Sequence, residues 1–179
     1  MAGPKRRAIA PEPEPPRLEA LVVDGANVIA SSRHRPLERL ALAEAWCASF
    51  RPDLPVLVFV DFATVQCCKP PVQATLRARC QDVTPGRPRY AIPPRGESAD
   101  GYLLAHAQSH QGLVLSNDRF WDFEELRRGV VTLQFHLKGD VLRVYDEATW
   151  FCGDAAVRLS VSALQLAGEA GERGGGGED

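Results

Sequence analysis

The chain has 179 residues, of which 45% are hydrophobic and 25% charged, so it is long enough for one globular domain and too short for two ordinary ones. Its formal net charge of -2 gives no global sign of nucleic-acid binding, although a neutral total can hide a local basic patch. No apolar run approaches the ~20 residues that a membrane span requires, and we expect no membrane partner.

The five cysteines are odd in number and irregularly spaced, which disfavours a disulfide framework. The basic start of the chain has no apolar stretch behind it, so we expect no secretory signal and a cytoplasmic location. His106 and His110 lie four residues apart and could share a helix face as metal ligands. Because no glutamate follows the first histidine, as it does in the H-E-x-x-H motif, a solvated helix face is the favoured interpretation.

Both ends of the sequence have the composition of disordered segments. Residues 1–17 contain five prolines and almost no large apolar side chains, and we expect a disordered proline-rich leader. Residues 168–179 are rich in glycine and charge, and we expect a disordered tail. The folded domain is therefore predicted to span residues 18–167.

Within this domain, short apolar runs alternate with segments of helical periodicity. In chain order we expect a strand at 21–23, a helix at 36–50, a strand at 56–60, a helix at 72–80, a strand at 89–92, a helix at 97–109, a strand at 113–115, a short helix at 120–128, and a hairpin of 130–137 with 141–145. Uniformly apolar short strands that alternate with helices predict an α/β fold whose parallel sheet is covered on both faces.

Three of the predicted strands are followed by an aspartate, namely Asp24, Asp61 and Asp118. Taken singly, each is typical of a turn former or a helix cap. Open parallel sheets, however, bind ligands beyond the carboxyl ends of their strands, so three such acids indicate a shared site. Converging carboxylates repel one another unless a cation joins them, and Mg²⁺ and Mn²⁺ prefer oxygen ligands. A metal held in this way activates water for phosphodiester hydrolysis.

Further polar residues lie near the predicted acidic site. Glu97 and Asp100 are three residues apart near a helix start, so we expect them to project on one face. Asn27 is a candidate to orient a carboxylate or a metal-bound water. Ser116 and Asn117 are candidates to donate hydrogen bonds to the metal ligands or to a phosphate. Complementarity to the helix dipole is the simpler explanation of the acids at the helix start.

Two motifs carry a resemblance to a known family. Val-Val-Asp-Gly-Ala-Asn-Val at 22–28 and Leu-Val-Leu-Ser-Asn-Asp-Arg-Phe-Trp-Asp at 113–122, with an acidic helix start between them, resemble the NYN branch of the PIN-like nuclease domains. Within that branch the sequence is most similar to the Regnase class of endoribonucleases, over roughly residues 20–150. The resemblance implies a three-layer α/β/α sandwich with a mostly parallel sheet, and Mg²⁺- or Mn²⁺-dependent cleavage of single-stranded RNA.

The resemblance also implies roles for individual residues. Asp24, Asp100 and Asp118 would bind the metal and act in catalysis, with Asn27 and Asp122 beside them as further catalytic residues.

The sequence departs from the Regnase pattern in two places. The class commonly carries two adjacent aspartates at the middle helix, where this chain has Ala99 and Asp100. Glu97 is expected to replace the missing metal ligand in part. The CCCH zinc finger that usually follows the nuclease domain is not found in this sequence.

Basic and aromatic residues are the candidates for binding RNA. We expect phosphate contacts from arginines in the loops near the acidic site, with Ser116 and Asn117 as further contacts. These arginines are Arg33, Arg35, Arg87, Arg89, Arg95 and Arg119. Tyr90, Phe120 and Trp121 could stack on bases, although packing is the favoured role for the last two. A solvated arginine-rich surface is the alternative.

The favoured function is therefore a metal-dependent endoribonuclease acting on single-stranded RNA. The alternative, prompted by Ala99, is a weakly active or inactive PIN-like module that binds RNA or a protein partner, or associates with itself. A toxin-like nuclease of the small PIN type also stays open. A dinucleotide-binding enzyme is disfavoured because no G-x-G-x-x-G follows the first strand.

Overall fold

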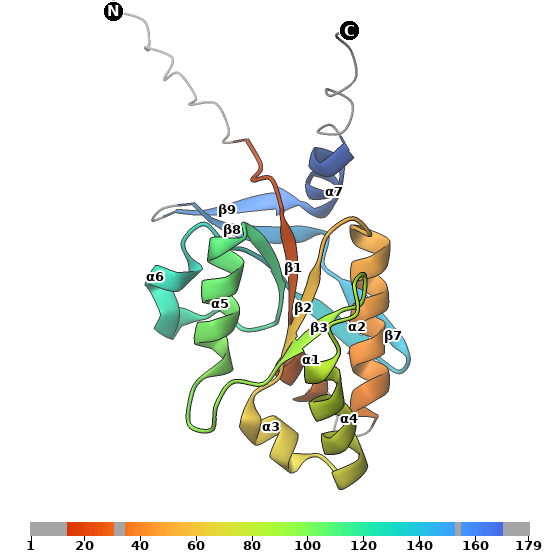
Figure 1. Cartoon of the computed structure of the whole chain (residues 1–179). Helices are drawn as coiled ribbons and strands as arrows, with labels where there is room; N and C mark the ends of the chain where they lie inside the picture. The colour runs from red at the N-terminus through yellow and green to blue at the C-terminus, as the bar shows by residue number, and fades with distance from the viewer. Residues whose placement is uncertain (1–13, 31–34, 153–154, 170–179) are drawn as a thin grey trace, which may run out of the picture.

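The structure is a computed structural model that describes residues 14–30, 35–152 and 155–169 (Figure 1). Its strands are β1 (Ala20–Asp24), β2 (Val56–Phe59), β3 (Arg89–Ala91), β4 (Gly112–Leu115), β5 (Val131–Leu133), β6 (Phe135–Lys138), β7 (Val141–Val144), β8 (Glu147–Cys152) and β9 (Ala155–Ser160). Its helices are α1 (Gly25–Ala30), α2 (Pro36–Phe50), α3 (Phe62–Cys67), α4 (Pro70–Gln81), α5 (Ala99–Ser109), the 3-10 turn η1 (Trp121–Phe123), α6 (Glu124–Arg127) and α7 (Val161–Glu169).

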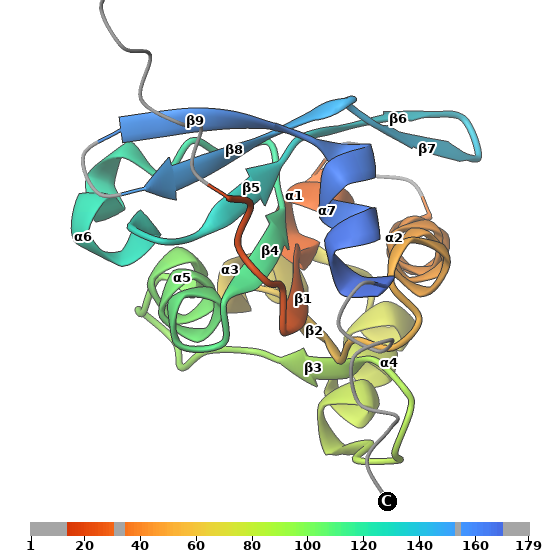
Figure 2. The same ribbon diagram turned by 90° about the horizontal axis from the view of Figure 1, so that it is seen from above.

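A seven-stranded sheet in the order β3-β2-β1-β4-β5-β8-β9 divides the molecule into three layers. The five strands from β3 to β5 are parallel, whereas β8 and β9 join antiparallel. Figure 2 shows α5 and α6 on one face of this sheet and α2, α4 and α7 on the other. The predicted α/β/α sandwich with a mostly parallel central sheet is therefore confirmed.

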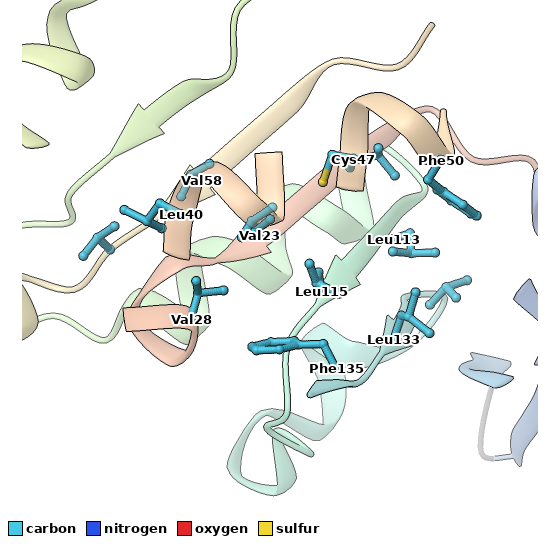
Figure 3. Close-up of a cluster of buried hydrophobic side chains, with 14 of the residues drawn as sticks. Val23, Val28, Leu40, Cys47, Phe50, Val58, Leu113, Leu115, Leu133 and Phe135 are labelled. Atoms are coloured by element: carbon cyan, nitrogen blue, oxygen red, sulfur yellow. The ribbon is translucent and has the colours of Figure 1, made fainter. Parts of the chain in front are cut away.

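The alternation of side chains along the strands supplies both faces of the core. Val23 and Leu115 pack with Val28 of α1 in the larger buried cluster (Figure 3). Val22, the residue before Val23, packs in a second cluster with Leu104 of α5. Successive residues of a strand point to opposite faces, so a strand buried on both faces has to be apolar throughout.

Capping residues and prolines define where the longer helices begin. Pro36 and Pro70 occupy the first positions of α2 and α4, where a missing N–H costs no helical hydrogen bond. The Asp61 carboxylate caps α3 by accepting from the backbone N–H of Thr64 at 2.7 Å. The Ser98 hydroxyl caps α5 by accepting from the N–H two residues later.

The predicted elements correspond to observed ones, with differences where the chain turns. The segment expected as one strand over 130–137 splits at Gln134, because β5 stays in the main sheet while β6 pairs with β7. The helix expected over 120–128 is the 3-10 turn η1 followed by α6. The six-residue helices α1 and α3 were not predicted, since they are too short to show helical periodicity. The elements β8, β9 and α7 were not predicted either.

The predicted domain boundaries can be compared with the structure only in part. Leu18 is buried in the core, and residues 14–17 form no regular element, while residues 1–13 of the expected leader lie outside the described residues. At the other end, residues 168–169 belong to α7 rather than to the tail, and residues 170–179 lie outside the described residues. Among the helices described, none has the length and apolar character to cross a membrane.

Gly25, at the junction of β1 and α1, lies where the chain passes closely against β2. A Cβ atom at this position would come within 2.8 Å of the Phe59 carbonyl oxygen and 2.8 Å of a Val60 methyl group. The nearest atom belongs to the backbone, so it cannot rotate away. Gly101 in α5 is different, because the nearest atom to an added Cβ is 3.5 Å away in the Phe123 ring.

We predict that Gly25→Ala lowers the free energy of unfolding by about 1–3 kcal/mol, because it overpacks a rigid junction. Gly101→Ala is the matched control and should raise it by roughly 0.5–1 kcal/mol, because alanine favours a helix interior. Urea denaturation of both variants measures the two changes. Equal stability of Gly25→Ala and the wild type would contradict the close approach.

Candidate active site

The strand order places one crevice at the carboxyl edge of the parallel sheet. The chain moves from β1 to β2 and β3 on one side, and then crosses to place β4 on the other side of β1. The carboxyl ends of β1 and β4 therefore flank the point where the strand order reverses. Ligands of open α/β sheets bind at such a point. The helices α1 and α3, which follow β1 and β2, lie at this edge, at the lower end of Figure 1.

Two polar residues meet at this crevice because of the alternation along their strands. Val22 of β1 and Val114 of β4 belong to the cluster that packs against α5. Asp24 and Ser116 come two residues later in each segment, so they continue the same side of the sheet. The Ser116 hydroxyl donates to Asp24 Oδ2 at 2.6 Å, a buried hydrogen bond that joins the two strand ends.

Asp24 is a buried carboxylate, with only 6% of its surface exposed. Its Oδ1 accepts from the backbone N–H of Asn27 at 2.9 Å. Burial raises the pKa of Asp24 to about 6, and repulsion from Asp100 and Asp118 adds to the rise, while the hydrogen bonds from Ser116 and Asn27 oppose it. Asp24 is therefore an acid whose charge is disfavoured by its surroundings.

Asp118 lies on the loop that follows β4. Its backbone N–H donates to Ser116 Oγ at 3.0 Å, so one hydroxyl group links this loop to Asp24. Its own Oδ1 accepts from the backbone N–H of Phe120 at 2.8 Å, which fixes the side chain in a tight turn. The Asp118 side chain is exposed, unlike that of Asp24.

Two further acids approach from neighbouring elements. Asp100 lies in the first turn of α5, half-buried, and its pKa is raised by burial first and then by repulsion from Asp118 and Asp61. Asp61 follows β2 and caps α3. The strand-end pattern predicts a shared site for Asp61 together with Asp24 and Asp118, whereas the family resemblance implies no role for Asp61.

The acids at this crevice do not form a closed metal site within the described residues. Asp24, Asp100 and Asp118 form no ion pair with a lysine, arginine or histidine within the part of the chain that is described. Nor do the described residues contain three or more His, Cys, Asp or Glu side chains placed to hold one metal ion together. Mg²⁺ commonly keeps several waters and takes only one or two carboxylates from the protein.

Within the described residues, the repulsion that links Asp24, Asp100 and Asp118 does not extend to Glu97 or Asp122. Glu97 does line a hollow with Asp61. Ser98 caps α5, so Glu97 precedes the helix and lies in a turn, where its carboxylate accepts from the Tyr102 hydroxyl. The expectation that Glu97 and Asp100 share a helix face is therefore wrong. Asp122 is exposed on η1. Ala99, at the position of the missing aspartate, is buried.

Asn27, Ser116 and Asn117 form the support of the site. Ser116 is fully buried, and its hydroxyl donates to Asp24, which is one of the residues predicted to bind the metal. The Asn117 side-chain oxygen accepts from the backbone N–H of Phe135 at 2.9 Å. Its backbone N–H donates to the Asn27 side-chain oxygen at 3.4 Å. Asn27 therefore orients Asp24 through its backbone and the loop through its side chain.

Two of the predicted arginines lie at the edge that carries the acids. Arg119 is exposed next to Asp118. Arg95 follows β3 and lines a hollow of about 640 Å³ together with Asp61, Phe62 and Glu97.

The other described arginines are placed differently. Arg89 begins β3 and pairs in register with Leu57 near the start of β2, so Arg87 and Arg89 lie at the opposite, amino edge of the sheet. Their expected position at the active edge is wrong, because a parallel crossover must return to the amino edge before the next strand starts. Arg35 precedes α2 and forms an exposed ion pair with Asp140 at 3.4 Å. Arg33 lies outside the described residues.

His106 and His110 lie toward the far end of α5, away from the acids. They line a hollow of about 700 Å³ at the amino edge, together with Arg87 and Arg89. Their rings stack with 4.2 Å between centroids. The pKa of His106 is lowered, by burial first and then by His110.

Comparison with known proteins identifies no relative. The sequence matches no protein-family model, and no curated protein matches it. The resemblance to the NYN and Regnase nucleases therefore depends on the motifs around Asp24 and Asp118 alone.

We predict that the stability of Asp24→Asn, measured relative to the wild type, rises as the pH is raised. The pKa of Asp24 is raised from 3.8 to about 6 in the folded state, so the stability contributed by its protonated form is present below about pH 4 and is lost as pH rises through 6. An uncharged asparagine escapes this loss, although it also loses one hydrogen bond with Ser116 or Asn27. The difference in the free energy of unfolding, variant minus wild type, should be about 1–2 kcal/mol more favourable to the variant at pH 7.5 than at pH 4.5.

Urea denaturation of both proteins at the two pH values measures this gain. Asp146→Asn is the control, because Asp146 is exposed and should show no such gain. If the free energies of unfolding of Asp24→Asn and the wild type differ by the same amount at both pH values, the raised pKa of Asp24 is contradicted.

Proposed function

We propose that this chain is a metal-dependent endoribonuclease that hydrolyses phosphodiester bonds in single-stranded RNA. The observation that carries the proposal is the buried Ser116 hydroxyl, which joins Asp24 to the Asp118 loop at the crevice where the strand order reverses. Asp100 is near enough to both acids for repulsion between the carboxylates. Repulsion of this kind costs free energy in the folded state. A bound divalent cation would offset that cost and give the acids a role as its ligands.

Asp24 and Asp118 are the proposed ligands, with Asp100 acting on the cation directly or through water. A bound Mg²⁺ or Mn²⁺ lowers the pKa of a coordinated water and neutralises charge on the phosphate. The chain supplies the orientation. Ser116 and the Asn27 backbone each hold one oxygen of Asp24, and the turn after Asp118 holds one oxygen of that carboxylate. Each acid thereby presents its remaining lone pairs from a fixed position.

The proposed path of RNA lies along the same edge. Arg119 beside Asp118 and Arg95 in the hollow next to Asp61 are the proposed phosphate contacts, because both flank the acids. Arg87 and Arg89 are not included, since four residues of β2, at about 3.3 Å each, separate the two edges of the sheet. We also propose a cytoplasmic location, because five cysteines at irregular spacing favour a reducing compartment.

We predict that the protein cleaves labelled single-stranded RNA in Mn²⁺ or Mg²⁺ and not in EDTA. Asp118→Asn should reduce the rate by at least about 100-fold, because it removes a charged ligand while its side-chain oxygen can still accept from the Phe120 N–H. Asp146→Asn is the matched control and should cleave like the wild type. A time course on denaturing gels gives the rates.

Cleavage that persists unchanged in EDTA, or in Asp118→Asn, would contradict the metal-dependent reaction. Calorimetric titration with Mn²⁺ should also show binding to the wild type that is weakened in Asp24→Asn. Because Asp24 is buried, thermal unfolding of each variant should be checked alongside the titration.

The second candidate function is a PIN-like module that binds RNA or a protein without turnover. Two observations favour it, namely Ala99 at the position of an expected aspartate and the lack of a three-ligand metal group among the described residues. This candidate predicts salt-sensitive RNA binding with no cleavage in Mn²⁺. RNA binding that is unchanged by Arg95→Glu combined with Arg119→Glu would count against the proposed path in either case.

A further inference from the structure

The structure distinguishes the three aromatic residues that were candidates for base stacking. Tyr90 is buried, and its hydroxyl donates to Glu44, which Arg79 also contacts at 2.9 Å. Phe120 is buried in the core cluster beneath α5. Trp121 is 66% exposed. The packing role expected for Phe120 is therefore confirmed, whereas Trp121 lies outside the core and contacts the surface of α6 through Arg127.

Trp121 is held in place although it is exposed. The Arg127 guanidinium lies 4.7 Å from the centroid of the Trp121 ring system and 4.8 Å from the centroid of the Phe151 ring. Arg127 also donates a hydrogen bond to the Arg119 carbonyl oxygen at 3.4 Å. A guanidinium positioned by a second ring and a backbone carbonyl supports the indole through a cation–π contact. The indole is therefore a fixed, solvent-facing ring with a cation against one face.

The backbone of Trp121 lies a short way along the chain from the acidic site, and its ring contacts Arg127, which in turn contacts Phe151 beside the start of β5. Trp121 follows Asp118 by three residues, so their Cα atoms are at most about 11 Å apart. Phe120 between them is anchored in the core with a φ of 51°, which fixes the direction in which the chain leaves the site. The short helix α6 that supplies Arg127 lies beside α5, as Figure 1 and Figure 2 both show.

We propose that Trp121 is a platform on which a base of single-stranded RNA stacks while the adjoining backbone runs past Asp118. The proposal rests on the nuclease or RNA-binding function of the same site and names the form of nucleic acid that it takes. Single-stranded RNA offers unstacked bases to aromatic side chains, whereas a duplex hides both faces of each base. Stacking also needs no particular base, because every base has a π-face.

The surroundings of Trp121 favour a base over a protein partner. Protein interfaces centre on contiguous apolar patches with packed aromatic anchors. Phe120, the neighbour of Trp121, is instead buried, and the exposed residues near it in sequence are Arg119, Asp122, Glu124 and Glu125, so the described part of this segment offers no contiguous exposed apolar patch. A single supported ring among charges matches a stacking contact.

The test is a fluorescence-anisotropy titration in EDTA, so that binding is measured without cleavage. The probe is a short labelled RNA, offered once as a single strand and once as a perfect duplex. Trp121→Ala should bind the single strand about tenfold more weakly than the wild type, because the π-face is lost. Trp121→Phe should restore most of the affinity, and binding of the duplex should not change.

Salt dependence separates stacking from charge. Trp121→Ala removes no charge, so the slope of log K against log salt should stay that of the wild type. Arg119→Ala should reduce the magnitude of that slope by about 0.7, the value for one phosphate contact on a single strand. Leu166→Ala, at an equally exposed apolar position on α7, is the control and should leave both affinity and slope unchanged.

Several outcomes would overturn the proposal. Equal affinity of Trp121→Ala and the wild type for the single strand would do so, as would an equal loss on the duplex or an absence of RNA binding by the wild type. A change of oligomeric state in Trp121→Ala with RNA binding intact would assign the ring to a protein interface. Trp121-dependent binding without cleavage in Mn²⁺ would instead leave the platform standing and overturn the nuclease alone.

Discussion

The hydrogen bond from the Ser116 hydroxyl to the Asp24 carboxylate is the interaction on which the candidate site depends. It crosses from the end of β1 to the end of β4, at the one place in the parallel sheet where the chain reverses its direction of travel. The same oxygen of Ser116 accepts from the N–H of Asp118, so a single buried hydroxyl group sets the positions of two acids. A carboxylate can be buried here because both of its oxygens accept hydrogen bonds from positioned donors.

Much of the architecture could be predicted because apolar strand runs and strand-end acids are local signals. Asp24 and Asp118 were placed together from the chain alone, since parallel strands bring their carboxyl ends to one edge. The route of the connecting segments between elements, in contrast, leaves no local pattern in the sequence. Arg87 and Arg89 were placed at the wrong edge because the crossover returns before β3 begins. Trp121 was misplaced because only one of the two adjacent aromatic rings, that of Phe120, enters the core, and the two rings have similar apolar character in the sequence.

The acidic group illustrates a conflict between stability and function. Burial and repulsion raise the pKa of Asp24, and the described part of the chain offers no ion pair in compensation. Burial of the apolar residues of β1 and β4, which are buried along their whole length, offsets this destabilisation. Sites of this kind are retained at the expense of stability when a ligand makes use of the charge. The hydrogen bonds that Asp24 and Asp118 accept restrict how far these two carboxylates can move apart.

The short strand β3 affects whether the sheet can pair edge to edge with another chain. As one free edge of the seven-stranded sheet, it exposes backbone groups that could pair with a strand from another chain. It is only three residues long and begins with the exposed Arg89, and the opposite edge, β9, carries the exposed Arg158. Charge and short length at sheet edges oppose edge-to-edge pairing. Arg89 therefore places a positive charge on a free edge of the sheet, where charge opposes pairing with a strand from another chain.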